Sequence, residues 1–117
     1  MSARMHLSPA HDAHPQDPSD AQLTYAAELL GLLADRTRLV LLHTLGKGEA
    51  DVTTLTEACG TARPAVSQHL AKLRLAGLVT VRKEGRRMIY ALPDGHLRRL
   101  VSEALNLADH GRRGSGS

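Results

Sequence analysis

Residues 52–77 decide the fold, and they read VTTLTEACGTARPAVSQHLAKLRLAG. This stretch predicts a short helix over about 52–58, a tight turn at 59–61, and a second helix that Thr61 caps and that runs to about Ala76. A tight, glycine-containing turn between two helices is typical of a helix-turn-helix unit.

The second of these helices has two sides of different character. At 100° per residue, Val66, Leu70 and Leu73 share one side, which we expect to face the core. The opposite side is small and polar, so it can approach a groove of DNA closely. The candidate DNA-binding residues of this helix are Arg63 for guanine, Ser67 and Gln68 for base edges, and Lys72 for phosphate.

A basic β-hairpin is predicted directly after this helix. Its strands span Leu78–Arg82 and Met88–Leu92, and both contain β-branched residues. The polar tip at 83–87 contains a glycine, as tight hairpin turns do. A helix-turn-helix followed by such a hairpin is a winged helix. The wing residues suited to phosphate or minor-groove contact are Arg82, Lys83, Arg86 and Arg87.

Three further helices complete the predicted fold. The first begins at Ser19, which forms a capping box with Gln22. The second begins at Asp35 or Thr37, and the last opens at Asp94 with an apolar stripe along one side. The prediction is therefore a mainly α winged helix-turn-helix with the order α-α-α-α-β-β-α.

A chain of 117 residues has room for one domain. We expect a flexible arm with histidines and prolines at 1–18, a DNA-binding and dimerisation domain at 19–110, and a flexible tail at 111–117. Aromatic residues make up only 2%, so the core depends on Leu, Val, Ala and Ile. Such a small core favours completion by a second copy of the chain.

Charge is distributed unevenly along the chain. Up to Gly60 there are four Lys or Arg against eight Asp or Glu, and from Thr61 onward there are eleven against four. A basic second half favours a polyanionic partner.

No arrangement of nucleophile and base, paired acids or phosphate-binding glycine loop is present, so we expect no enzyme and no catalytic residues. The single cysteine, Cys59, excludes an internal disulfide and is expected to be a buried structural thiol. No apolar run is long enough for a membrane span, which favours the cytoplasm.

Four segments, 33–39, 65–74, 76–79 and 85–92, resemble the ArsR/SmtB family in residue order and spacing. The resemblance covers about residues 21–110, and Arg36 replaces the proline usual before Thr37. It implies a homodimer joined through the first and last helices. It also implies binding to double-stranded operator DNA with an inverted repeat, usually as a repressor.

The resemblance also implies metal sites. The cysteine-based site needs thiolates around residues 49–55, and this chain has none there. The site on the last helix draws ligands from both chains of the dimer; Leu107 breaks its pattern, and Asn106, Asp109 or water could complete it. The matching residues are Asp94, His96 and His110, and His6, His11 and His14 of the arm could add ligands, as in the nickel- and cobalt-sensing members. These donors suit Ni²⁺, Co²⁺ or Zn²⁺ as an effector.

Two functional hypotheses follow. In the first, the chain is a metal-responsive repressor whose DNA affinity changes when the ion links the last helices. In the second, the last-helix site is degenerate and the regulator is metal-blind or depends on a co-regulator protein. The first hypothesis is the preferred interpretation, and the second is the alternative. The alternative rests on the ordinary roles open to these residues, because Asp94 is also a good helix N-cap and histidines are common on surfaces. His43 and His69 are expected to be structural or surface residues. A winged helix that binds only protein would lack salt-dependent affinity for duplex DNA.

Overall fold

The computed structural model describes residues 17–116, with side chains through Arg113. It forms two units, which divide after Gly31. Helix α2 (Asp20–Leu33), which starts in the first unit and ends in the second, begins with the predicted capping box. The Gln22 N–H donates to Ser19 Oγ at 3.1 Å, and the Ser19 N–H donates to Gln22 Oε1 at 2.8 Å.

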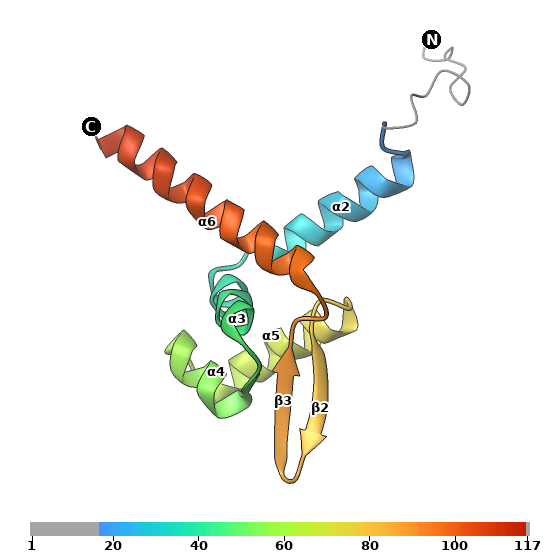
Figure 1. The fold of residues 1–117 in the computed structure, drawn as a ribbon, viewed down its shortest axis with the longest axis vertical. Coiled ribbons are helices and arrows are strands. Elements are labelled where there is room, and N and C mark those ends of the chain that lie inside the picture. The colour runs from blue at the N-terminus through green and yellow to red at the C-terminus, as the bar shows by residue number, and fades with distance from the viewer. Residues whose placement is uncertain (1–16, 117) are drawn as a thin grey trace. The chain divides into compact units, whose positions relative to one another are not determined.

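The second unit is a winged helix-turn-helix, as predicted (Figure 1). Its helix-turn-helix is α4 and α5, and its wing is the hairpin of β2 and β3. The elements in chain order are α3 (Arg36–Lys47), β1 (Ala50–Asp51), α4 (Val52–Cys59), α5 (Arg63–Leu75), β2 (Thr80–Glu84), β3 (Arg87–Ala91) and α6 (Gly95–Gly116).

Aspartate side chains fix the starts of α3 and α4. Asp35 Oδ2 accepts the N–H of Arg38 at 3.0 Å, and Asp51 Oδ1 accepts the N–H of Thr54 at 2.9 Å. Each bond satisfies one of the backbone donors that the first turn of a helix leaves without a partner. Gly60 ends α4 in the left-handed conformation, with φ of 64°, which glycine adopts without steric cost.

The expected cap of α5 at Thr61 is wrong. The N-cap is Ala62, which makes no side-chain hydrogen bond, and the helix begins at Arg63. Pro64 has no N–H for a capping side chain to bind. The next two N–H groups, those of Ala65 and Val66, donate to the carbonyl of Ala62 at 3.0 and 3.1 Å. The turn therefore closes through the backbone and needs no cap side chain.

The wing belongs to a three-stranded antiparallel sheet with the order β1-β3-β2. The short strand β1 was not predicted; it pairs Ala50 with Tyr90 and Asp51 with Ile89. The hairpin turn is tighter than the predicted five-residue tip, because Glu84 pairs with Arg87. Only Gly85 and Arg86 form the turn, and Gly85 supplies the positive φ of 64° that such a turn requires.

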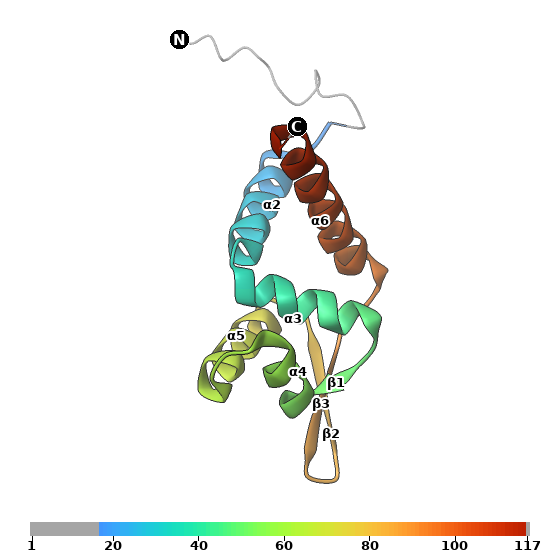
Figure 2. The ribbon, with the colours of Figure 1, turned by 90° about the vertical axis from the view of Figure 1, so that its left-hand side faces the viewer.

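The core lies where α3 meets α4, α5 and α6, and Figure 2 shows α3 passing over α4 and α5. Aliphatic side chains fill it, as the composition predicts. The buried cluster consists of Leu33, Leu41, Leu42, Leu45, Leu55, Val66, Leu70, Leu73, Val79, Leu97 and Val101.

Helix α6 continues to Gly116, beyond the expected start of a tail at Gly111. Asp109 Oδ1 lies 3.4 Å from Arg112 Nη2, and Asp109 Oδ2 lies 3.1 Å from Arg113 Nε. Ion pairs three and four residues apart support a helix across a glycine. No helix in the described part of the chain is long and apolar enough to cross a membrane.

Candidate nucleic-acid interface

Helix α5 separates an apolar side from a polar side, as the periodicity predicts. Val66, Leu70 and Leu73 have no exposed surface. The residues that point away from the core are all exposed, so this side of the helix is open to a partner. They are Pro64, Ser67, Gln68, Ala71 and Lys72.

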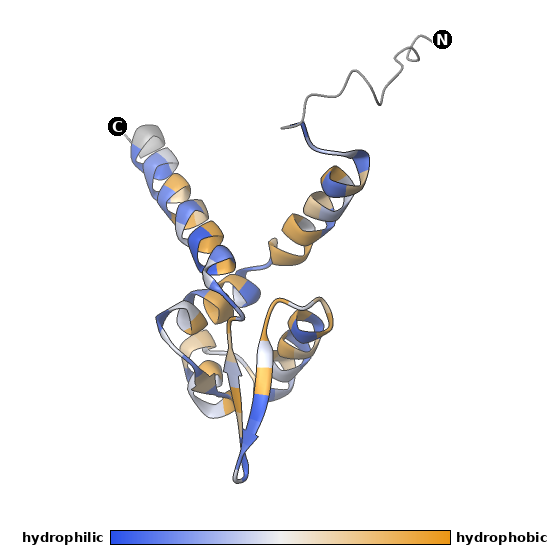
Figure 3. Ribbon diagram, turned by 45° about the vertical axis from the view of Figure 1, so that its right-hand side comes forward, coloured by the Kyte–Doolittle hydropathy of each residue, from blue (hydrophilic) through white to orange (hydrophobic). Residues whose placement is uncertain are grey.

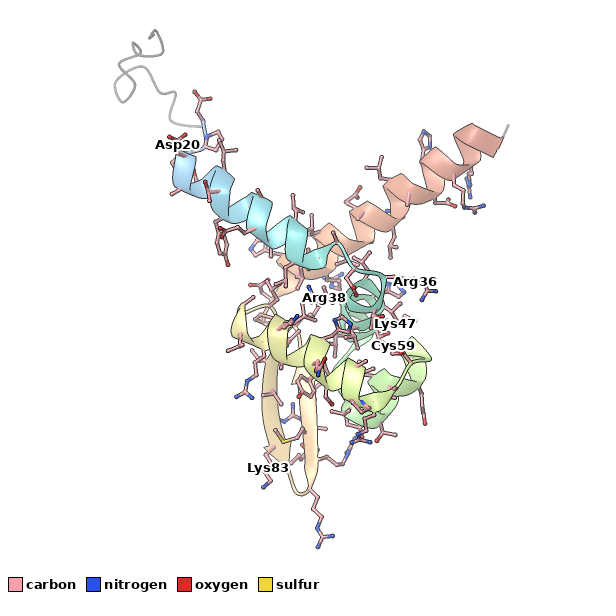
Figure 4. The ribbon with its side chains drawn as sticks, turned by 180° about the vertical axis from the view of Figure 1, so that it is seen from behind. Asp20, Arg36, Arg38, Lys47, Cys59 and Lys83 are labelled. Carbon is pink, nitrogen blue, oxygen red and sulfur yellow. The ribbon has the colours of Figure 1, made fainter. Side chains whose placement is uncertain are left out.

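A hydrogen-bonded cluster attaches α5 to the start of α3. Arg38 Nε donates to His69 Nδ1 at 3.0 Å, and Arg38 Nη1 donates to the carbonyl of Leu32 at 2.8 Å. Figure 4 shows Arg38 reaching from α3 towards α5. His69 Nε2 lies 3.9 Å from Asp35 Oδ2, and the backbone N–H of Arg38 holds the pKa of Asp35 below its ordinary value. His69 is therefore a half-buried structural residue that helps to orient the polar side of α5.

Two of the four candidate arginines and lysines of the wing already have carboxylate partners. Arg82 contacts both oxygens of Glu49, at 2.7 and 2.9 Å, and Glu84 Oε2 at 3.0 Å. Arg87 Nε donates to Asp51 Oδ2 at 3.1 Å. The hydrogen bonds between Arg82 and Glu49 lower the pKa of Glu49 and raise the pKa of Arg82, so both groups stay charged. These pairs connect the wing to β1 and to the residue before it.

The end of the wing carries the other two cations. Lys83 and Arg86 are exposed and make no ion pair in the part of the chain that the structure describes. Figure 4 shows Lys83 near the end of the hairpin, and Figure 3 shows that this end is hydrophilic. Their charge is available to a polyanion, whereas the charge of Arg82 is compensated by neighbours.

Arg63 is the first residue of α5. Its Nη1 donates to Thr53 Oγ1 of α4 at 3.3 Å. Beside it is a hollow of about 190 Å³, here called the arginine pocket. The arginine pocket is lined by Asp51, Val52, Thr53, Arg63, Arg86, Arg87 and Met88. Residue spacing along the chain does not reveal that Arg63 and two wing arginines line one hollow.

The predicted metal ligands are spread along α6. Asp94 Oδ1 accepts the N–H of His96 at 2.9 Å, which caps the helix, and His96 Nδ1 lies 2.8 Å from Arg99 Nη2. His110 is fourteen residues further along the helix, about 21 Å at 1.5 Å per residue. Within the described residues of one chain, no three His, Cys, Asp or Glu side chains gather closely enough to hold a metal ion. A site made of these residues would need the last helices of two chains.

The remaining candidates stand as follows. Asp109 is engaged with Arg112 and Arg113. His6, His11 and His14 lie outside the described residues. Cys59 is a free, half-buried thiol in α4, and burial raises its pKa, which makes it less reactive.

These features define a class of protein, the winged helix-turn-helix DNA-binding proteins. A family model described as a helix-turn-helix domain matches residues 33–82. The regulator KmtR of Mycobacterium tuberculosis is 41% identical over 85% of this chain and 76% of its own length.

Two solved structures share the fold. The antimony-specific transcriptional repressor AntR aligns with a TM-score of 0.74 and 29% identity, covering 85% of this chain and 93% of that one. The homodimeric winged helix-turn-helix domain of Mb0332 from Mycobacterium bovis aligns with a TM-score of 0.72 and 30% identity, covering 85% and 94%. The chain belongs to the ArsR/SmtB family of DNA-binding transcriptional regulators. The family consists of regulators and not of enzymes.

Proposed function

We propose that this protein is a transcriptional repressor that binds an inverted repeat in operator DNA as a homodimer. The observation that carries the proposal is the exposed polar side of α5, at Ser67, Gln68 and Lys72, next to a wing that ends in Lys83 and Arg86. In this arrangement α5 occupies the major groove and the end of the wing contacts the backbone or the minor groove. We propose that it acts in the cytoplasm, where its DNA target lies.

Exposed apolar side chains on two helices support the homodimer. Clustered exposed hydrophobic residues mark a surface that another chain covers, and each of these two helices, taken by itself, carries several. The solved Mb0332 domain is described as homodimeric, which makes a second copy of this chain the natural partner. The residues concerned are Leu23, Tyr25 and Leu30 of α2, and Leu100, Leu105 and Leu107 of α6.

Selection of duplexes from a random library tests this proposal. We expect the full chain to enrich an inverted repeat whose half-sites are centred one helical turn apart, about 10–10.5 base pairs, or a multiple of it. Affinity for the selected duplex should fall steeply as salt rises, because phosphate binding releases counterions. A chain that enriches no sequence and binds no duplex more tightly at low salt would contradict the proposal.

The effector is proposed to be Ni²⁺, Co²⁺ or Zn²⁺, bound between two chains. Asp94 Oδ2 and His96 Nε2 make none of the described contacts, so one chain could supply both, with His110 from the partner. Such an ion would fix the angle between the two copies of α6, and hence the spacing of the two α5 helices. A coupling free energy of about 1–3 kcal/mol changes DNA affinity about 5–150-fold.

Metal titration against the selected duplex tests the effector. We expect Ni²⁺, Co²⁺ or Zn²⁺ to weaken DNA binding by wild type and to leave the His96→Ala variant unchanged. His43→Ala, which removes an exposed histidine from α3, is the matched control and should respond like wild type. Equal affinities with and without metal in wild type would contradict metal sensing.

One observation favours the alternative, a metal-blind regulator. One atom of each group that matches the metal pattern at the start of α6 already has a partner, since Asp94 Oδ1 caps the helix and His96 Nδ1 lies next to the Arg99 guanidinium. A cation next to the imidazole also opposes the approach of a second cation. In this alternative, DNA binding responds to a co-regulator protein and not to metal.

A further inference from the structure

We propose that the arginine pocket binds one backbone phosphate of the DNA duplex, and that Arg63 contacts this phosphate and does not read guanine. The inference rests on the proposed DNA-binding function and assigns a ligand class, a phosphodiester, to a hollow between α4, α5 and the wing.

The position of Arg63 on α5 points to the backbone. It is the first residue of the helix. Ala71 lies near the middle of the polar side, and Arg63 is displaced from Ala71 by about 80° around the helix axis. Its guanidinium donates sideways to Thr53 of α4, at 3.3 Å. A side chain held against α4 is directed to the rim of the interface, where the phosphates of a bound duplex run.

The charges around the arginine pocket fit a single anion. Three arginines are among the residues that line it, Arg63, Arg86 and Arg87, against one acidic residue, Asp51. Both Asp51 oxygens are engaged, Oδ1 with the N–H of Thr54 and Oδ2 with Arg87 Nε. Glu84 lies 3.9 Å from Arg87 Nη1 but does not line the hollow. Two positive charges are left uncompensated, which is enough to hold one phosphodiester with its single negative charge.

The carboxylate also has a geometric role. By capping α4 and holding Arg87, Asp51 joins the helix-turn-helix to the wing at the edge of the arginine pocket. Arginine suits such a site because its planar fork can donate two bonds to phosphate oxygens. A phosphate bound here fixes the register of α5 in the groove and leaves sequence reading to Ser67 and Gln68.

Salt-dependent binding of Arg63→Ala to two duplexes tests the inference. The duplexes are the one selected by wild type and a scrambled duplex of equal composition. We expect the variant to lose affinity for both by the same factor, about tenfold or more. The slope of log affinity against log salt should become shallower by about 0.9 for each phosphate that the variant no longer neutralises. Arg63→Lys should recover part of the loss because it restores the charge.

Two controls separate the arginine pocket from other effects. Arg98→Ala removes the same charge from α6, away from the arginine pocket, and should change neither affinity nor slope appreciably. Single methylphosphonate substitutions in the selected duplex remove one phosphate charge at a time. At one position in each half-site, wild type should lose about tenfold, and Arg63→Ala should lose nothing further.

The outcomes distinguish this inference from the proposed function. If Arg63→Ala weakens only the selected duplex, Arg63 reads a base and the inference is wrong while the function stands. The same holds if the variant stays as sensitive as wild type to every methylphosphonate. If wild type itself binds neither duplex, the proposed function fails and the phosphate site fails with it.

Discussion

Leu70→Ala in α5 should lower the free energy of unfolding by about 2–5 kcal/mol. Leu70 has no exposed surface and packs in the cluster that joins α5 to the rest of the core. Removing its side chain loses apolar burial and leaves a cavity that a small core cannot fully close. Because domains of this size are stable by only about 5–15 kcal/mol, the variant should be close to unfolding. Urea denaturation followed by circular dichroism measures the change.

Leu75→Ala provides the matched control. It is the same substitution in the same helix, but Leu75 is 89% exposed. The expected change in unfolding free energy is therefore within about 0.5 kcal/mol. Equal costs at the two positions would mean that α5 does not bury the side assigned to the core.

The buried side of α5 could be predicted because it depends on residue spacing alone. Leucine and valine at positions 66, 70 and 73 share one side of any helix, whatever surrounds it. The same holds for the capping box at Ser19, since it is a pair of bonds between residues three apart. The sequence leaves the start of α3 open between Asp35 and Thr37, and the structure places the cap at Asp35. Helix periodicity and capping hydrogen bonds can be predicted because each depends only on a short stretch of sequence.

The interactions that shape the interface could not be predicted in this way. Arg82 meets Glu49 across 33 residues, Arg87 meets Asp51 across 36, and Arg38 meets His69 across 31. No spacing rule links residues so far apart, because the fold alone brings them together. The two-residue strand β1 has the same origin, since it exists only as the neighbour of β3. Hence the wing arginines looked alike in the sequence, yet they differ in how much charge they can offer.

Ser67→Glu should lower affinity for the selected duplex by more than 100-fold. Ser67 is exposed on the polar side of α5, four residues after Arg63, and its side chain makes none of the described hydrogen bonds. A carboxylate there would face the negative charge of the groove and its phosphates. Like charges across an interface cost several kcal/mol, each 1.4 kcal/mol is tenfold, and a dimer carries the change twice. Fluorescence anisotropy at low salt measures the loss.

Stability should not change in this variant, which makes the loss specific to binding. Glutamate is at least as good a helix former as serine, and the position is exposed. Ser102→Glu makes the same substitution at an exposed position of α6 and should bind the duplex nearly as wild type does. Ser67→Ala, which adds no charge, should lose far less than Ser67→Glu. If Ser67→Glu bound the duplex as tightly as Ser102→Glu, the polar side of α5 would not face DNA, and the groove-reading assignment of Ser67, Gln68 and Lys72 would have to be abandoned.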